Sequence, residues 1–357
     1  MRPRRLPFPE LATLAPDELR GAVLLGPVRL PDGTLPKGTR LDPALAARLI
    51  AAAVAGGGAE PVRLAWPDPG DLHEDEAAAR LAAAVAGEGI EPRPPRQSRL
   101  DLSARWDGVL RVRPEALSRV NAVDPLEVFT LYTGQSVTTG EVVASVKVAP
   151  HLVPGAAVDE GMRVAREHYP LVEVRPYLAL EVGAIAEEAM TPAALARFEA
   201  GARTKVESLG SRFAGTIVVG DADPEAAERG CREALSTLAN ERGLPVILVG
   251  GVSAGDPLSP FLAALRSLGG AVVRRGVPAH PGSMIWLARL GSSRLLGLPS
   301  CGMFSLATAA DLVLPRLLTG EPLEAADLAD LGHGGVLTRD MRFRFPAYAR
   351  DLPAPPG

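Results

Sequence analysis

The chain has few cysteines and few aromatic residues. Its two cysteines, Cys231 and Cys301, are far apart among 357 residues, and neither belongs to a Cys-x-x-Cys pair. Two isolated cysteines do not make a disulfide framework. We therefore expect a reducing compartment and a cytoplasmic location.

Strong net charge and long apolar runs are also lacking. The 38 basic and 42 acidic residues give a net charge of −4, which argues against nucleic acid as a main partner because no basic stripe is present. No segment offers the ~18 uninterrupted apolar residues of a membrane span, and no apolar h-region follows Met1–Arg5. At 47% hydrophobic and 22% charged residues, the composition is that of a globular protein with room for two or three domains.

A strand–turn–helix pattern stands out between residues 245 and 268. The apolar run Pro245–Val249 is followed by Gly250-Gly251-Val252-Ser253-Ala254-Gly255-Asp256 and an amphipathic segment, Pro260–Leu268. Glycines permit a close approach of main chain to ligand, and the N–H groups of a helix start favour an anion. The pattern predicts a phosphate site, although such a turn more often has no ligand.

Two more loops follow predicted strands in the same region. Ala271–Val273 leads to a loop that contains Pro281-Gly282-Ser283, and the strands Met284–Leu290 and Arg294–Leu298 lead to Pro299-Ser300-Cys301-Gly302 and a helix over Met303–Leu318. Loops that follow parallel strands gather at one edge of the sheet. We expect a crevice there.

The order of these motifs resembles the molybdopterin-binding domain of molybdenum insertases and molybdopterin adenylyltransferases. The matching motifs are Gly250–Asp256, Gly276-Val277, Pro281-Gly282 and Gly297–Ser300, within residues 173–320. The likeness is closer to the molybdopterin-binding half of cytidylyltransferase fusion proteins, because Val120–Pro154 also looks like theirs. No nucleotidyltransferase half is present.

The resemblance implies a three-layer α/β/α domain with a mostly parallel sheet, preceded by a smaller α+β region. It implies molybdopterin, a pterin phosphate, as ligand, with Mg²⁺ and ATP or another nucleotide as further ligands, a homo-oligomer, and a separate nucleotidyltransferase as partner. The residues it places around the ligand are Gly250, Gly251, Val252, Ser253, Gly255, Pro281, Gly282, Ser283, Pro299, Ser300 and Cys301.

The loops depart from the family pattern at several positions. Val249 stands where insertases have Ser or Thr, and Ser283 replaces a lysine, which removes a charge that would offset phosphate. Asp256 is then the first candidate for a catalytic, metal-binding carboxylate, and Asp221 is the second candidate for the metal. Lys205 is either a phosphate ligand or a solvated helix residue.

The remaining patterns predict the domain organisation. We expect an N-terminal α+β subdomain over 1–95, a β-rich accessory subdomain over 96–170, the α/β domain over 171–320 and an extended tail over 321–357. The charged run His73–Glu76 is read as a helix start rather than a metal site. Lys147 and His151 are candidates for the ligand crevice, with solvated positions as the alternative. Predicted helix N-caps are Asp42, Thr191 and Asp223.

Three functions are compatible with these patterns. The first is an enzyme of molybdenum-cofactor biosynthesis that transfers a nucleotide or inserts metal with Mg²⁺. The second is a module that binds molybdopterin without changing it, as a carrier or sensor. The third is an α/β domain that binds another phosphorylated metabolite.

Overall fold

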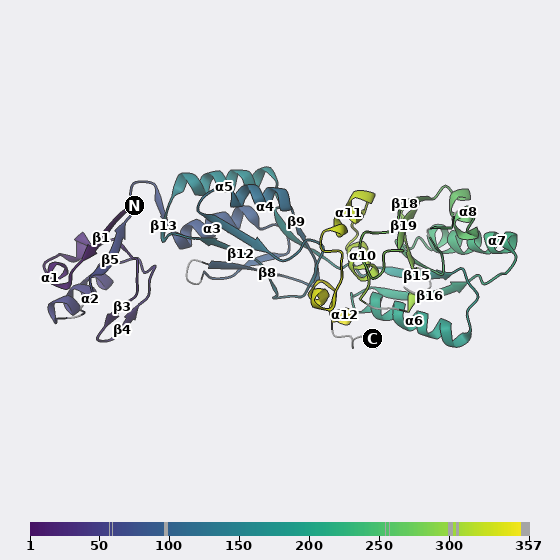
Figure 1. Cartoon of the computed structure of the whole chain (residues 1–357), viewed down its shortest axis with the longest axis horizontal. Helices are drawn as coiled ribbons and strands as arrows, with labels where there is room; N and C mark the ends of the chain where they lie inside the picture. Colours follow the sequence, from purple (N-terminus) through teal and green to yellow (C-terminus); the bar gives the residue numbers. More distant parts are fainter. Residues whose placement is uncertain are drawn as a thin grey trace. The chain divides into compact units, whose positions relative to one another are not determined.

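The computed structural model describes residues 1–350 except 57, 59, 96–98, 254, 257, 299–302 and 305–306. The chain forms two compact units (Figure 1). Unit 1 comprises residues 1–105, 111–131 and 139–174, and unit 2 comprises residues 106–110, 132–138 and 175–357. The expected subdomains 1–95 and 96–170 thus fall mainly in unit 1.

The N-terminal part of unit 1 is a small α+β structure. Strands β1 (Arg2–Leu6), β5 (Val62–Trp66) and β2 (Val23–Leu24) form an antiparallel sheet in that order. Beside it lie α1 (Phe8–Leu11), η1 (Pro16–Glu18), the hairpin of β3 (Val28–Leu30) and β4 (Gly33–Leu35), and α2 (Pro43–Val54). The predicted cap of α2 is confirmed, because the Leu45 N–H donates to Asp42 Oδ1 at 2.8 Å.

The rest of unit 1 is built on a four-stranded antiparallel sheet. Its order is β10 (Leu126–Thr130), β12 (Val142–Val148), β8 (Arg99–Ala104) and β7 (Ile90–Pro92). The helices α3 (Glu74–Val85), α4 (Pro114–Asn121) and α5 (Gly155–Glu167) pack on this sheet and on one another. A short pair, β6 (Asp71–His73) with β13 (Leu152–Pro154), adjoins α3.

Unit 2 contains a six-stranded sheet. Its order is β16 (Arg212–Val218), β15 (Glu181–Ala186), β17 (Val246–Gly250), β20 (Ser293–Leu298), β19 (Trp286–Leu290) and β18 (Ala271–Arg275). The first four strands are mutually parallel, and β19 is antiparallel to both of its neighbours. This confirms the expected mostly parallel sheet.

Helices cover both faces of this sheet, so the three-layer α/β/α architecture is confirmed. Val246 and Leu248 of β17 pack with α6 (Pro192–Glu207) and α10 (Ala310–Leu317). Ile247 and Val249 of the same strand pack with α7 (Pro224–Leu235), η2 (Ser236–Glu241) and α8 (Pro260–Ser267). Alternate residues of a strand point to opposite faces, which explains why an uninterrupted apolar run forms this central strand.

Three predicted elements differ from the structure. The sequence over Val172–Val182 predicts one strand, the first of the α/β domain, whereas the structure has two strands there, β14 (Val172–Pro176) and β15. The helix expected from Met303 is α10, which begins at Ala310. The expected extended tail instead holds α11 (Ala325–Ala329), η3 (Asp330–Gly332), η4 (Arg339–Arg344) and α12 (Ala347–Arg350). Its turns are short and their apolar residues irregularly spaced, yet Leu323, Leu328 and Phe345 are buried in the core of unit 2.

In the described part of the chain, no helix has both the length and the apolar character that crossing a membrane requires.

Candidate functional site

The loops singled out from the sequence lie along the carboxyl edge of the unit 2 sheet. The Glu187 N–H, just after β15, donates to the Gly250 carbonyl at the end of β17 (3.1 Å), and the Gly251 N–H donates to the Leu298 carbonyl at the end of β20 (3.1 Å). The indole of Trp286, at the start of β19, donates to the Val252 carbonyl at 3.0 Å. Four chain segments therefore meet at this edge.

Glycine is required at two turns of this edge. Gly251 has a φ of +85°, and a Cβ there would lie 3.0 Å from Glu188 Cγ. Gly282 has a φ of +102°, and its Cβ would lie 2.7 Å from the Ala309 nitrogen. A side chain at either position would be strained by its backbone angle and crowded by its neighbour. The Ala309 N–H also donates to the Pro281 carbonyl at 2.8 Å, so this loop lies directly against the start of α10.

The start of α8 holds a carboxylate of the protein itself. Glu187 Oε1 accepts hydrogen bonds from the Phe261 N–H at 3.0 Å and the Ser259 hydroxyl at 3.2 Å. Burial raises the pKa of Glu187, the two hydrogen bonds oppose that shift, and the charges of Asp256 and Glu188 add to it. The donors at the start of α8, where the sequence predicts a phosphate, thus bind the Glu187 carboxylate instead. The sequence analysis did not identify Glu187 as their partner. Its one sequence signal is its place directly after a buried strand.

The two aspartates proposed as metal ligands are engaged in turns of their own loops. Asp256 Oδ1 accepts the Leu258 N–H at 2.9 Å, and Asp221 Oδ1 accepts the Asp223 N–H at 3.0 Å. Both side chains belong to exposed residues. Among the described residues, no three His, Cys, Asp or Glu side chains are grouped to hold a metal ion. The described carboxylates therefore form no site that would hold a metal ion with three protein side chains.

Lys205 is neither a solvated residue nor a free cation. It is 1% exposed and forms an ion pair with Asp311 Oδ1, which is also buried and also accepts the Tyr348 hydroxyl at 2.9 Å. Asp311 Oδ2 accepts the Thr308 N–H at 2.9 Å. Burial and the Asp311 charge raise the pKa of Tyr348. The solvated alternative for Lys205 is therefore wrong, and a buried carboxylate from a distant helix takes up its charge. The role as a phosphate ligand stays a prediction.

The remaining predicted residues are placed as follows. Ser253 Oγ accepts the Gly255 N–H at 3.2 Å, within the loop itself, and the Ser283 carbonyl accepts the Val277 N–H at 2.9 Å. Pro299, Ser300 and Cys301 lie outside the described residues.

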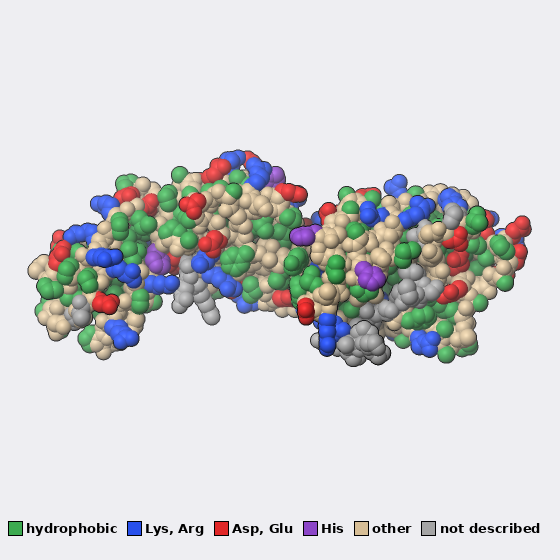
Figure 2. Space-filling model, viewed as in Figure 1, with side chains coloured by type: hydrophobic (Ala, Val, Ile, Leu, Met, Phe, Trp, Pro, Cys, Tyr) green, Lys and Arg blue, Asp and Glu red, His purple; other side chains and the backbone are tan. Residues whose placement is uncertain are grey.

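Figure 2 shows acidic side chains gathered on the part of unit 2 drawn at the right.

The two candidates in unit 1 belong to other surroundings. His151 Nδ1 lies 2.9 Å from Glu74 Oε2, and Glu74 is 3% exposed. Lys147 lines a groove on the four-stranded sheet together with Arg93, Arg99 and Phe129. The start of α3 is capped by His73, whose Nδ1 accepts the Asp75 N–H at 3.2 Å.

No family model and no curated protein sequence matches this chain. Solved structures with similarity include the molybdopterin biosynthesis enzyme MoaB from Thermus thermophilus, at 21% identity over 40% of this chain and 98% of that one, with a TM-score of 0.26. The molybdopterin biosynthesis protein MoeA from Pyrococcus horikosii is 15% identical over 70% of this chain and 80% of that one, with a TM-score of 0.29. MogA is 16% identical over 38% and 90%, with a TM-score of 0.25. Similarity at this level establishes no function for this chain.

Proposed function

We propose that unit 2 binds a phosphorylated pterin of the molybdopterin type at the carboxyl edge of its sheet, and that it carries this ligand without changing it. One observation supports the proposal above all. The loops around Gly251 and Gly282, whose order in the sequence resembles a molybdopterin-binding domain, both lie at this edge as turns that require glycine. Clefts at this edge are the usual ligand sites of open α/β sheets.

The side chains favour binding over transfer. Nucleotidyl transfer depends on metal ions that neutralise the developing charge, and the described residues bring no three metal-binding side chains together. Asp256 holds an N–H of its own loop, and the charge of Lys205 is committed to Asp311. A carrier of this kind would pass its ligand to a separate nucleotidyltransferase.

Copurification tests the proposal. The protein is isolated from cells that make molybdopterin, the bound material is oxidised, and fluorescent pterin is measured per mole of protein. We expect a near-stoichiometric pterin in the wild type and its loss in Gly251→Ala. Gly291→Ala is the matched control, because Gly291 also has a positive φ, +55°, but lies in the β19–β20 turn at the other end of the sheet with open space around it.

Other results would replace the proposal. Wild-type protein without pterin that retains another phosphorylated metabolite would favour the third function. Turnover of molybdopterin that depends on Mg²⁺ and ATP, and that Asp256→Asn abolishes while pterin stays bound, would favour the enzyme.

A further inference from the structure

The Pro281-Gly282 loop of the candidate site is paired with the C-terminal segment, residues 321–350. The His280 N–H donates to the Gly335 carbonyl at 2.8 Å, and the Leu337 N–H donates to the His280 carbonyl at 2.8 Å. These two hydrogen bonds form a parallel β-bridge. Because Leu337 is buried in the core of unit 2, the C-terminal segment anchors the residue directly before Pro281.

Glycine is required where the loop and the C-terminal segment meet. A Cβ at Gly335 would lie 2.2 Å from the Pro278 carbonyl oxygen and 2.6 Å from the Leu331 carbonyl oxygen. Both neighbours are backbone atoms, so they cannot move aside as the end of a flexible side chain can. Glycine permits this close approach, and a side chain at residue 335 would push the C-terminal segment away from the loop.

A turn at residues 307–309 supports the other side of the same loop, since the Ala309 N–H donates to the Pro281 carbonyl. Ala307 has a φ of +60°, the one positive φ of a non-glycine residue in the described part of the chain. Such a conformation is uncommon and persists where neighbouring contacts hold it. Asp311 makes these contacts, because its Oδ2 accepts the Thr308 N–H at 2.9 Å and the Thr308 hydroxyl at 3.2 Å.

The C-terminal segment also reaches this turn, through Asp311. The Asp311 side chain is fully buried, and its Oδ1 accepts the Tyr348 hydroxyl at 2.9 Å and pairs with Lys205. The Lys205 Nζ lies 5.8 Å from the centre of the Tyr348 ring. One carboxylate thus connects the turn with the C-terminal segment, and the lysine balances its charge.

We infer that the C-terminal segment positions the Pro281-Gly282 loop for its ligand. Gly335 and Leu337 hold one side of the loop, and Tyr348 holds the turn on the other side through Asp311. Tyr348 and Asp311 are positioning residues, because they act on the ligand only through the loop. The ligand itself rests on the proposed function, whereas the order of the loop can be measured without any ligand. A loop that is already ordered binds more tightly than one that has to be ordered on binding.

Hydrogen exchange of the full chain without ligand tests the positioning, by mass spectrometry of peptides that contain His280 or Ala309. Tyr348→Phe should speed the exchange of the Ala309 peptide about tenfold, the effect of losing one hydrogen bond to a charged group. Gly335→Ala should act mainly on the His280 peptide, because it disturbs the other side of the loop. Peptides of α7, on the opposite face of the sheet, should exchange as in the wild type, which a general loss of stability would not allow.

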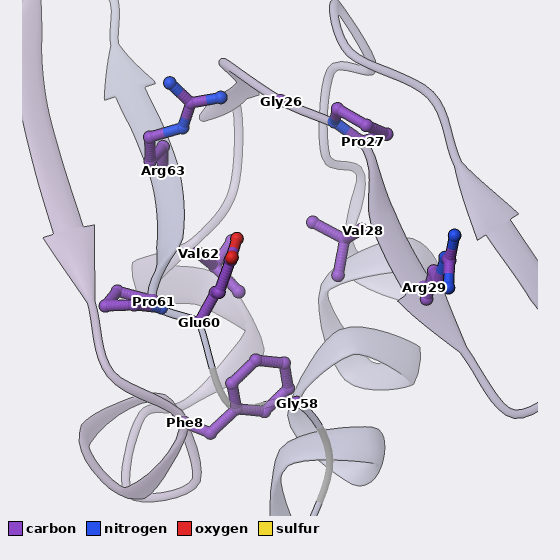
Figure 3. A pocket seen from close by; sticks show the side chains of 10 residues that line it. All are labelled: Phe8, Gly26, Pro27, Val28, Arg29, Gly58, Glu60, Pro61, Val62 and Arg63. Carbon is purple, nitrogen blue, oxygen red and sulfur yellow. The ribbon is translucent and has the colours of Figure 1, made fainter.

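The release of copurified pterin during dialysis tests the consequence for binding. We expect Tyr348→Phe and Asp311→Asn to release pterin about tenfold faster than the wild type. Tyr132→Phe is the control for the first change, since it removes the hydroxyl of an exposed tyrosine of unit 2. Glu60→Gln is the control for the second, since Glu60 is an exposed carboxylate of unit 1, at the cavity that Figure 3 shows. Thermal melts of all variants confirm folding.

The inference is overturned if Tyr348→Phe exchanges as the wild type does, if Tyr132→Phe speeds exchange equally, or if exchange rises while pterin release stays unchanged. A wild type that retains no pterin would remove the proposed function. Faster loop exchange in Tyr348→Phe would still support the positioning in that case, so the two failures are distinguishable.

Discussion

Glu187 is the residue whose environment departs most from what its position in the sequence suggests. Its carboxylate accepts two hydrogen bonds at the start of α8 while burial raises its pKa. In the folded protein it therefore keeps a proton to a higher pH than in the unfolded chain. Because the folded state binds more protons in this window, stability falls as the pH rises from the ordinary glutamate range through the raised pKa.

Glu187→Gln should remove this pH dependence. The free energy of unfolding of the variant, measured by urea titration at pH values from about 4 to about 7, should fall less with rising pH than that of the wild type. Glu233→Gln is the control, because Glu233 is exposed and is not among the groups that shift the pKa of Glu187. Parallel curves for Glu187→Gln and the wild type would contradict the prediction.

Lys205 permits a second prediction at the scale of one side chain. Lys205→Met leaves the Asp311 carboxylate buried without its cation, which should cost about 3 to 5 kcal/mol of unfolding free energy. Arg203→Met on the same helix breaks the exposed Arg203–Glu207 pair (2.7 Å) and should cost no more than about 1 kcal/mol. Chemical denaturation of both variants measures the difference, and equal losses would show that the buried pair is not special.

Local patterns predicted residues whose partners are near in sequence, and missed those whose partners are distant. The caps Asp42, Thr191 and Asp223 each accept an N–H three residues ahead, as predicted. The partner of Lys205 is 106 residues away and that of Glu187 is 74 residues away. Spacing within one helix or loop carries no information about such contacts.

At the scale of elements, the segment from Glu321 to Arg350 is part of the core of unit 2. Leu323, Leu328 and Phe345 are buried with α6 and α10, and Tyr348 of α12 reaches Asp311. A chain that stops after Gly320 should therefore fail to unfold cooperatively and should expose apolar surface. A chain that stops after Arg350 is the control. Urea unfolding and dye binding compare the two, and matching cooperative transitions would contradict this prediction.

The strands of unit 2 could be predicted because both faces of the sheet are covered, which requires apolar runs such as Val246–Val249. The 321–350 segment could not, because its turns are too short to show a period. The start of α10 was placed too early because Ala307 and Ala309, two apolar residues just before the helix, lie in a bend and a turn.

At the scale of the whole molecule, the chain passes between the two units more than once. Residues 106–110 and 132–138 belong to unit 2, where Val109 pairs with Ser136. The expected boundaries at 95, 170 and 320 follow the chain linearly and do not foresee such returns, because strand pairing over a distance decides them. The homo-oligomer expected from the family resemblance stays a prediction.

Mg²⁺ should have little effect on the stability of the whole chain. A ligand that binds the folded state raises stability by RT ln(1 + [L]/Kd), and the described carboxylates form no metal group. We expect the same melting temperature with millimolar Mg²⁺ and with EDTA. A rise of several degrees with Mg²⁺, lost in Asp256→Asn, would instead indicate a metal site at this loop.

The carboxylate at the start of α8 also determines how a ligand would arrive. The hydrogen-bond donors at the start of α8 already bind the Glu187 carboxylate. A phosphate that binds to the same donors has to displace this carboxylate. The free and the bound states then differ in which anion accepts these hydrogen bonds. Binding at this helix start would be a competition between the Glu187 carboxylate and the ligand phosphate, and the carboxylate would bind again after the ligand dissociates.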